Sequence, residues 1–184
     1  MEKLMQGKQI YLRKMQPEDA NERYLSWIND PQVNQYTETR FDLSTLQNIK
    51  DYVDQQINSK DSVFLAMVLT DTGQHIGNIK IHRIDKTHKN AEISLLIGEK
   101  TSWGKGIGAE AISLITQYAF NDLKLNKLYA KCYSNNIGSI KAFEKAGYIR
   151  EGCMRKQYCF GDVFVDGIIL GMLRNETGGK NGSS

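Results

Sequence analysis

The sequence has few of the features that mark membrane, secreted or metal-dependent proteins. Its longest uninterrupted apolar run, residues 63–69, is far shorter than a membrane helix, which needs about 20 residues. The N-terminal stretch MEKLMQGKQIYLRKM contains no apolar core of signal-peptide length. The three cysteines form no CxxC pair, and the three histidines form no HExxH motif or close ligand pair. These absences predict a cytoplasmic protein without disulfides, without a metal and without a membrane partner.

The length and net charge of the chain narrow the possible class of protein further. The chain has 184 residues, of which 40% are hydrophobic and 24% are charged, as in ordinary globular domains. Lys plus Arg is 24 and Asp plus Glu is 21, so the net charge is +3, too weak to indicate a nucleic-acid partner. We predict one domain over residues 1–174. The segment after Leu173 is polar and Gly-rich, which predicts a disordered tail over residues 175–184.

Hydrophobic periodicity gives an element order of mixed strands and helices. Hairpins together with two crossover connections predict an α+β fold, an α/β/α sandwich with a mixed, partly parallel sheet of about seven strands flanked by helices. The predicted elements are a strand at 10–13, helices at 17–28 and from Ser44 to Ile57, strands at 63–69, 75–84 and 91–97, a helix at 106–123, a strand at 127–134, a helix at 137–146, and strands at 148–156 and 163–173.

The sharpest motif is the turn WGKGIG, residues 103–108, between a predicted buried strand and a strong amphipathic helix. Its three alternating glycines leave backbone N–H groups unscreened by side chains. The start of the helix adds the positive end of a dipole, and Lys105 adds a positive charge. A turn of this composition is suited to holding a pyrophosphate.

Three ligand classes use such a turn. A Walker A loop is excluded, because Gly98 to Gly104 contains one residue too many and Gly106 stands where Ser or Thr must hold magnesium. A dinucleotide fingerprint matches Gly104, Gly106 and Ala109, but the next strand, 127–134, ends without the acid that holds the ribose. An NAD-type oxidoreductase therefore stays as an alternative. The third class is the pyrophosphate loop of coenzyme A.

Four further segments carry a family resemblance. They are AEISLLI (91–97), WGKGIGAE (103–110), NNIGSIKAFEKAGY (135–148), and EGCMR (151–155) together with Asp166. These segments resemble the acetyl-CoA strand, the pyrophosphate loop, the second cofactor motif and the closing signature of the GNAT acetyltransferase superfamily, in its RimJ/RimL-like branch. The opening WINDP (27–31) also fits that branch. The resemblance spans most of residues 7–174 and implies a GNAT fold that transfers acetyl from acetyl-CoA to a primary amine in a ternary complex.

The resemblance also implies how acetyl-CoA is held. Backbone groups of Leu96 and Ile97 would pair with the pantetheine arm like an added strand. Asn136 and Ser139, which also suit helix capping, would contact the pantetheine or the thioester region. The residues implied to surround the pyrophosphate are Trp103, Gly104, Lys105, Gly106, Ile107, Gly108 and Ala109.

Acyl transfer also requires proton transfer, for which the chain offers few groups. Glu92 lies in a mostly apolar strand and is either a solvent-facing residue or a general base, direct or through water. Many relatives carry a Tyr seven residues after the Asn of the second motif, where this chain has Phe143. We therefore take Tyr158 as the substitute acid, with Ser139 second, although Tyr158 also suits an amphipathic strand. A thiolate with a pKa of about 8.5 leaves readily even without an acid.

The acceptor pocket is expected from residues 27–40 and the final hairpin, with Asn34, Tyr36 and Arg40 as binding residues or as parts of an ordinary polar loop. Freeing a lysine amine of a proton at neutral pH costs about 4.6 kcal/mol, against about 1.4 for an α-amine. A weakly basic acceptor is therefore favoured. The resemblance to the RimJ/RimL branch implies a protein N-terminal α-amine, whereas the stretch from WINDP to ETR (27–40) resembles acetyltransferases of nucleotide-linked amino sugars. Of the two, a small amine such as a nucleotide-linked amino sugar is favoured over a peptide N-terminus. The chain is expected to be a monomer or homodimer. Because of Phe143, a non-catalytic acyl-CoA sensor is a further alternative.

Overall fold

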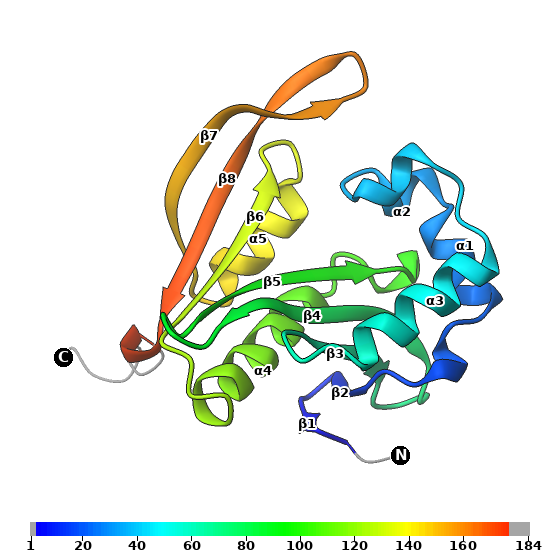
Figure 1. Ribbon diagram of the computed structural model, residues 1–184, viewed down its shortest axis with the longest axis horizontal. Helices are drawn as coiled ribbons and strands as arrows, with labels where there is room; N and C mark the ends of the chain where they lie inside the picture. The colour runs from blue at the N-terminus through cyan, green and yellow to red at the C-terminus, as the bar shows by residue number, and fades with distance from the viewer. Residues whose placement is uncertain (1–2, 177–184) are drawn as a thin grey trace.

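A mixed eight-stranded sheet forms the centre of the computed structural model, which describes residues 3–176 (Figure 1). The strand order is β1-β2-β3-β4-β5-β6-β8-β7. Among these strands β5 and β6 run parallel, and every other neighbouring pair is antiparallel. The strands are β1 (Met5–Gln6), β2 (Ile10–Lys14), β3 (Val63–Leu69), β4 (His75–Asp85), β5 (Asn90–Ile97), β6 (Lys127–Tyr133), β7 (Ile149–Phe160) and β8 (Val163–Leu173). The predicted α+β sandwich is confirmed, and the additional strand is the two-residue β1.

Helices cover both faces of the sheet and divide the core in two. One apolar cluster joins α4 and α5 to the sheet, and the other joins α1 and α3 to β2 and β3. The helical segments are η1 (Pro17–Asp19), α1 (Glu22–Ile28), α2 (Pro31–Asn34), η2 (Glu38–Phe41), α3 (Leu46–Ile57), η3 (Lys100–Ser102), α4 (Ile107–Asn121), α5 (Ile137–Lys145) and η4 (Arg174–Glu176).

Strand β5 separates these two cores. Its residues Ala91 and Ile93 are buried in the cluster with α4 and α5. Successive side chains of a strand point to opposite faces, so Glu92 and Leu96 face α1 and α3, where Leu96 packs against that second cluster. The alternation therefore places one carboxylate on an otherwise apolar strand, on the face opposite α4.

The sheet opens between β5 and β6. The two strands pair over three residues each, from Asn90–Glu92 on β5 to Lys127–Tyr129 on β6. Beyond this seam β5 stays with β4 and β6 stays with β8, and Figure 1 shows the two strands diverging. The second half of β5 consequently has no strand neighbour on its β6 side among the described residues.

Several boundaries differ from the sequence-based prediction for local reasons. The helix predicted over 17–28 is two segments, because the side chain of Asn21 accepts hydrogen bonds from the first turn of α1. Thr45, rather than Ser44, caps α3 through a capping box with Asn48. Strand β7 continues to Phe160, four residues beyond the predicted end at 156.

The C-terminal prediction lies largely outside the described part of the chain. Residues 175–176 of the predicted tail complete η4, and residues 177–184 are outside the described residues. Within residues 3–176, no helix is long and apolar enough to cross a membrane.

Candidate active site

A cavity of about 640 Å³ lies on the α1–α3 side of the sheet, beside the opening between β5 and β6. The sheet forms its floor, and α1, α3 and the segment from Tyr36 to Ser44 form one wall. The start of α5 and strand β7 supply the opposite wall. Of the residues predicted from the sequence to act in catalysis or binding, those that line the cavity are Tyr36, Glu92, Leu96, Asn136, Ser139 and Tyr158.

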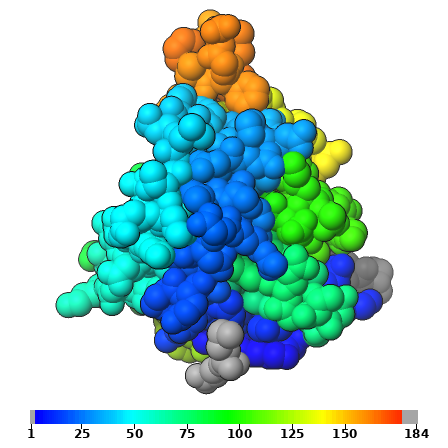
Figure 2. All heavy atoms as spheres, turned by 90° about the vertical axis from the view of Figure 1, so that its right-hand side faces the viewer, coloured from blue at the N-terminus to red at the C-terminus, as the bar shows by residue number. Residues whose placement is uncertain are grey.

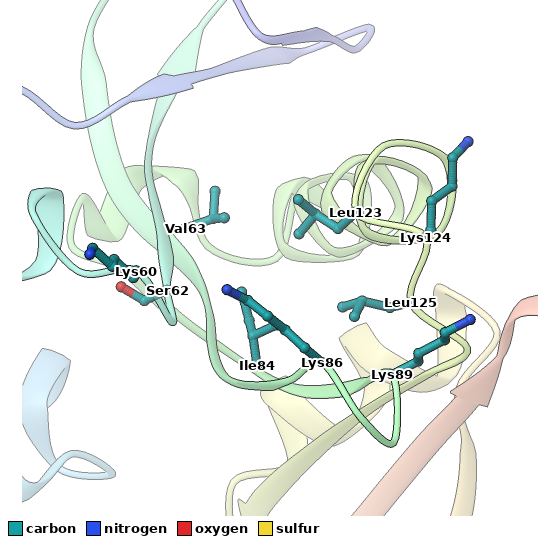
Figure 3. Close-up of a pocket in the computed structure, with 9 residues that line it drawn as sticks. All are labelled: Lys60, Ser62, Val63, Ile84, Lys86, Lys89, Leu123, Lys124 and Leu125. Atoms are coloured by element: carbon teal, nitrogen blue, oxygen red, sulfur yellow. The ribbon is translucent and has the colours of Figure 1, made fainter.

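A second, smaller hollow of about 330 Å³ is lined by apolar residues and lysines, including Lys60, Lys86, Lys89 and Lys124 (Figure 3). No carboxylate, histidine or tyrosine is among its lining residues. It therefore offers no group that accepts a proton at neutral pH, and none of the predicted site residues lies there. The larger cavity is the candidate active site.

Glu92 is the carboxylate at the floor of the cavity, at the last residue pair of the seam between β5 and β6. It is 9% exposed. Its Oε2 lies 3.1 Å from Arg83 Nη1 and 3.6 Å from Lys131 Nζ. Arg83 and Lys131 therefore hold this carboxylate in place at the floor of the cavity.

His82 is a cavity residue that the sequence analysis did not select. It is the cross-strand partner of Glu92. Burial, together with the positive charge of Lys80, lowers the pKa of its imidazole to about 4, so the ring is neutral at pH 7. Its Nε2 is buried and has no hydrogen-bond partner among the described residues. A neutral ring nitrogen beside Glu92 can exchange a hydrogen bond with a bound amine.

Tyr158 reaches the cavity from an irregular part of β7. Met154 pairs with Gly167 and Tyr158 with Val165, so β7 has three residues where β8 has one. The carboxylate of Asp166 closes this bulge by accepting the backbone N–H of Lys156 at 2.8 Å. Bulges of this kind redirect side chains, and the Asp of the closing signature thereby helps to position a cavity residue.

The ring of Tyr158 is fixed by its neighbours. It stacks on the ring of Tyr133 at 4.1 Å between centroids. A Cβ at Gly167 would lie 2.9 Å from its Cε2, so the glycine leaves room for the ring. Burial, with the negative charge of Glu92, raises the pKa of Tyr158. The phenol therefore keeps its proton at neutral pH and can act as a donor.

Two segments far apart in the sequence meet over the cavity. Tyr36 stacks on Phe160 with ring centroids 5.4 Å apart, and Arg40 Nη2 donates to the carbonyl of Cys159 at 2.8 Å. Figure 2 shows these N-terminal segments, in blue and cyan, directly below the orange tip of the β7–β8 hairpin. The contacts join the segment after α2 to the tip of this hairpin, next to the cavity residue Tyr36. We call the three side chains Tyr36, Arg40 and Phe160 the bridge.

Two of the three predicted acceptor residues are not in the cavity wall. Asn34 is 8% exposed, and its Nδ2 donates to the carbonyl of Ile28 at 2.8 Å, which fixes the turn after α1. Arg40 does not line the cavity, because its guanidinium is bound to the carbonyls of Thr37 and Cys159. Tyr36 is the predicted acceptor residue that does line the cavity.

The glycine-rich turn has the backbone that its sequence predicts. Gly104 has φ +74° and Gly106 has φ +83°, a region that residues with a Cβ enter only at a cost. Gly106 occupies the N-cap of α4 without a capping side chain, which leaves the first N–H groups of the helix available. A Cβ at Gly106 would lie 3.5 Å from Lys145 Nζ. Lys145, on α5, therefore adds a second positive charge at the turn beside Lys105.

The other residues of the turn have structural tasks. A Cβ at Gly108 would make ordinary contacts with Ala142 at 3.5 Å and Ile97 at 3.6 Å, so this position faces α5 and β5 and has room for a methyl group. Ile107 and Ala109 are also buried. The indole N–H of Trp103 donates to the carbonyl of Ile97 at 2.9 Å. That carbonyl, which we expected to pair with pantetheine, is thus already engaged.

The start of α5 forms the cavity wall next to β6. Asn136 is the N-cap, and its Oδ1 accepts the backbone N–H of Ser139 at 3.1 Å. The Ser139 hydroxyl lies 3.4 Å from the sulfur of Cys132. Phe143 also lines the cavity, although it is 1% exposed and its ring packs edge-on against Tyr148 with centroids 5.1 Å apart. Within residues 3–176, no three His, Cys, Asp or Glu side chains are grouped to hold a metal ion.

Comparisons with known proteins agree with this geometry. The family model described as "Acetyltransferase (GNAT) domain" matches residues 9–149. The uncharacterized N-acetyltransferase p20 of Bacillus licheniformis is 28% identical over 172 residues, which cover 92% of this chain and 96% of that protein. A spermidine N-acetyltransferase from Vibrio cholerae, solved with CoA and spermine, has a TM-score of 0.82 at 19% identity and covers 91% of this chain and 97% of its own. The acetyltransferase MccE, solved with acetyl-CoA and AMP, has a TM-score of 0.77 at 21% identity, with coverages of 91% and 93%.

The family match and the fold together define an acetyl-CoA-dependent N-acetyltransferase. The chain belongs to the GNAT acetyltransferase family, and within it to the RimJ/RimL type. The family resemblance is thereby confirmed. The alternatives of an NAD-type oxidoreductase and of a non-catalytic acyl-CoA sensor are set aside.

Proposed function

We propose that this enzyme acetylates a small primary amine held in the cavity, such as a nucleotide-linked amino sugar, by direct attack on acetyl-CoA in a ternary complex. The observation that carries the proposal is the position of Glu92. Its carboxylate lies in the cavity at the residue pair where β5 leaves β6. A base is thus present where a thioester placed along the free edge of β5 would meet an acceptor.

The coenzyme arm is proposed to lie in the opening between β5 and β6. The free edge of β5 offers backbone groups that an extended amide-containing chain can pair with, as an added strand does. Leu96 supplies such groups, whereas at Ile97 the Trp103 indole competes for the carbonyl. The pyrophosphate would meet the N–H groups at the start of α4 and the charges of Lys105 and Lys145.

The chemical step requires two proton movements. The nitrogen lone pair attacks the thioester carbonyl to form the C–N bond, and Glu92 takes the proton that the amine loses. The C–S bond then breaks, and the coenzyme A thiolate leaves. Tyr158 is proposed to give this thiolate its phenolic proton and to regain one from solvent. Ser139, whose hydroxyl contacts Cys132, is the second candidate donor.

The bridge favours a small acceptor over a peptide N-terminus. The stacked rings of Tyr36 and Phe160 leave less room for a folded protein to reach the cavity from this side. The charged side chains in the cavity walls also affect the binding of polyamines. A diamine whose second ammonium group lies near Lys80, a cavity residue without a carboxylate within ion-pair distance among the described residues, is repelled by it, because like charges at close range repel. Spermine, the amine in the Vibrio cholerae structure, is thus disfavoured here.

An amine panel with acetyl-CoA tests the proposal by thiol release and product mass. Its arms are amino sugars, nucleotide-linked amino sugars, peptides with free N-termini and polyamines. We expect the highest kcat/KM in the first two arms. The Phe160→Ala variant, which removes the stack on Tyr36, should raise kcat/KM for peptides selectively. Turnover confined to peptides in the unmodified enzyme would overturn the small-amine proposal.

A further inference from the structure

Two lysines line the cavity, and their environments differ. Lys131 lies 3.6 Å from the carboxylate of Glu92. Lys80 has no carboxylate within ion-pair distance among the described residues. Its Nζ instead donates to the hydroxyl of Tyr52 at 3.0 Å and to Oε1 of Gln56 at 3.2 Å. The Nζ also lies 5.3 Å from the ring centroid of Tyr52 and 6.0 Å from that of Phe64. An ammonium group has three N–H donors, so the two neutral oxygens leave one donor, and the charge of Lys80 has aromatic neighbours but no anionic partner among the described residues.

The position of Lys80 relative to Glu92 follows from the strand register. On β4, Lys80 pairs with Ser94 of β5, and His82 pairs with Glu92. Lys80 and His82 are two residues apart, so both face the cavity, and about 7 Å of strand separates their levels. The charge of Lys80 is thus offset along the cavity floor from the carboxylate.

The other charged groups make one end of the cavity more negative than the other. Glu38, which accepts a hydrogen bond from Tyr133 at 3.3 Å, and Glu92 line the part of the cavity next to β6 and β7. His82 is neutral at pH 7, because its pKa is lowered to about 4 by burial and by Lys80. The positive charge of Lys131 is matched by Glu92. Lys80, held by α3, is therefore the cavity cation that lacks a counterion.

We infer that the acceptor amine carries an anionic oxygen group, a carboxylate or a phosphate, which Lys80 binds while the amine lies at Glu92. The inference rests on the proposed function and names the substrate class of the same site. An amine without a second charge leaves Lys80 unpaired, and a second ammonium group is repelled by it.

The test compares matched pairs of amines that differ in one anionic group. Glucosamine 6-phosphate against glucosamine is the phosphate arm, and 4-aminobutyrate against butylamine is the carboxylate arm. Steady-state kcat/KM is measured for each amine at saturating acetyl-CoA. A hydrogen bond to a charged group predicts that kcat/KM of the unmodified enzyme is about 10- to 100-fold higher for the anionic member of at least one pair. The arm with the larger ratio identifies the anion.

Substitutions test whether Lys80 causes the preference for anionic amines. Lys80→Gln keeps the length and hydrogen bonding of the side chain and should bring the ratio close to unity. Lys80→Glu should invert it, so that glucosamine and butylamine are acetylated faster than their anionic counterparts. Lys60→Gln, which removes a positive charge at the other hollow, is the matched control and should retain the ratio. Calorimetric affinity for acetyl-CoA reports whether each variant is folded.

The outcomes separate the two proposals. Equal kcat/KM for both members of each pair, or a ratio that Lys80→Gln leaves unchanged, overturns the inference and leaves acetylation of small amines standing. Failure of all four amines, with acetylation of peptides in the panel described above, overturns the small-amine proposal and the inference with it.

Discussion

Replacing Glu92 with glutamine separates the chemical role of this carboxylate from its structural one. Gln keeps the size of the side chain and an oxygen that can accept a hydrogen bond, but it cannot take a proton at neutral pH. The structural loss is small, because the Arg83 side chain is 66% exposed and Lys131 lies 3.6 Å away. Such screened pairs contribute about 1 kcal/mol. A general base contributes about 10²- to 10⁴-fold in rate, so the kinetic loss should exceed the structural one.

The pH dependence gives this prediction its direction. At low pH the acceptor amine is mostly protonated and needs a base, so Glu92→Gln should reduce kcat/KM most there. At high pH the free amine dominates and the variant should partly recover. The assay is kcat/KM for glucosamine from about pH 6 to about pH 9, a range around the pKa of a weakly basic amine. Acetyl-CoA affinity should stay near that of the unmodified enzyme, since the proposed coenzyme site consists of backbone groups and the glycine-rich turn and does not include the Glu92 side chain.

Arg83→Gln provides the matched control. It removes the exposed partner of Glu92 and leaves the carboxylate in place, so its profile should keep the shape of the unmodified enzyme's profile. The reasoning is refuted if the Glu92→Gln profile also keeps that shape and lies within about threefold, far below the range of a general base. Glu92 would then serve packing and charge balance, and His82 would be the next group to test.

Three other substitutions probe the turn, the core and the imidazole. Gly106→Ala should weaken acetyl-CoA binding about 10- to 100-fold in calorimetry, because the residue has φ +83° at the start of α4, whereas Gly108→Ala should bind normally. Phe143 lines the cavity but is 1% exposed and packs in the core, so the added hydroxyl of Phe143→Tyr should lower the free energy of unfolding by about 1–3 kcal/mol in urea melts without raising turnover; faster turnover would show instead that the hydroxyl reaches the cavity. In the folded protein the pKa of His82 is lowered from 6.5 to about 4, so the unfolded chain binds more protons between these values and stability falls as pH drops through them. The His82→Phe variant should lose about 1–2 kcal/mol less stability than the unmodified protein over this pH range, a value that allows for solvent screening of the partly exposed ring. Equal loss of stability with falling pH in the variant and the unmodified protein would refute the lowered pKa of His82.

The elements and the glycine-rich turn could be predicted because their signals are local. The alternation along residues 91–97 places Glu92 on one face of a strand. The glycines at 104 and 106 predict a turn that needs positive φ. The split of the helix predicted over 17–28 was missed, because the cap at Asn21 competes locally with a continuous helical pattern. The bulge that aims Tyr158 was missed as well, since it depends on how β7 pairs with β8.

The walls of the cavity could not be predicted, because they depend on which segments meet in space. Asn34 and Arg40 belong to the expected acceptor loop, yet their side chains bind backbone carbonyls. His82 and Lys80 had a usable signal, namely polar residues at alternate positions of a strand otherwise rich in isoleucine. That pattern is typical of a solvent-facing edge, and the sequence does not reveal that α1 and α3 cover this face.

The seam between β5 and β6 makes the sheet two half-sheets joined over three residue pairs. The proposed base, Glu92, belongs to the half containing β4 and β5, and the proposed acid, Tyr158, belongs to the half containing β6, β7 and β8. The ion pair of Glu92 with Lys131 of β6 joins the halves at the point where they part. The separation of the proposed base from the proposed acid therefore depends on the angle between the half-sheets.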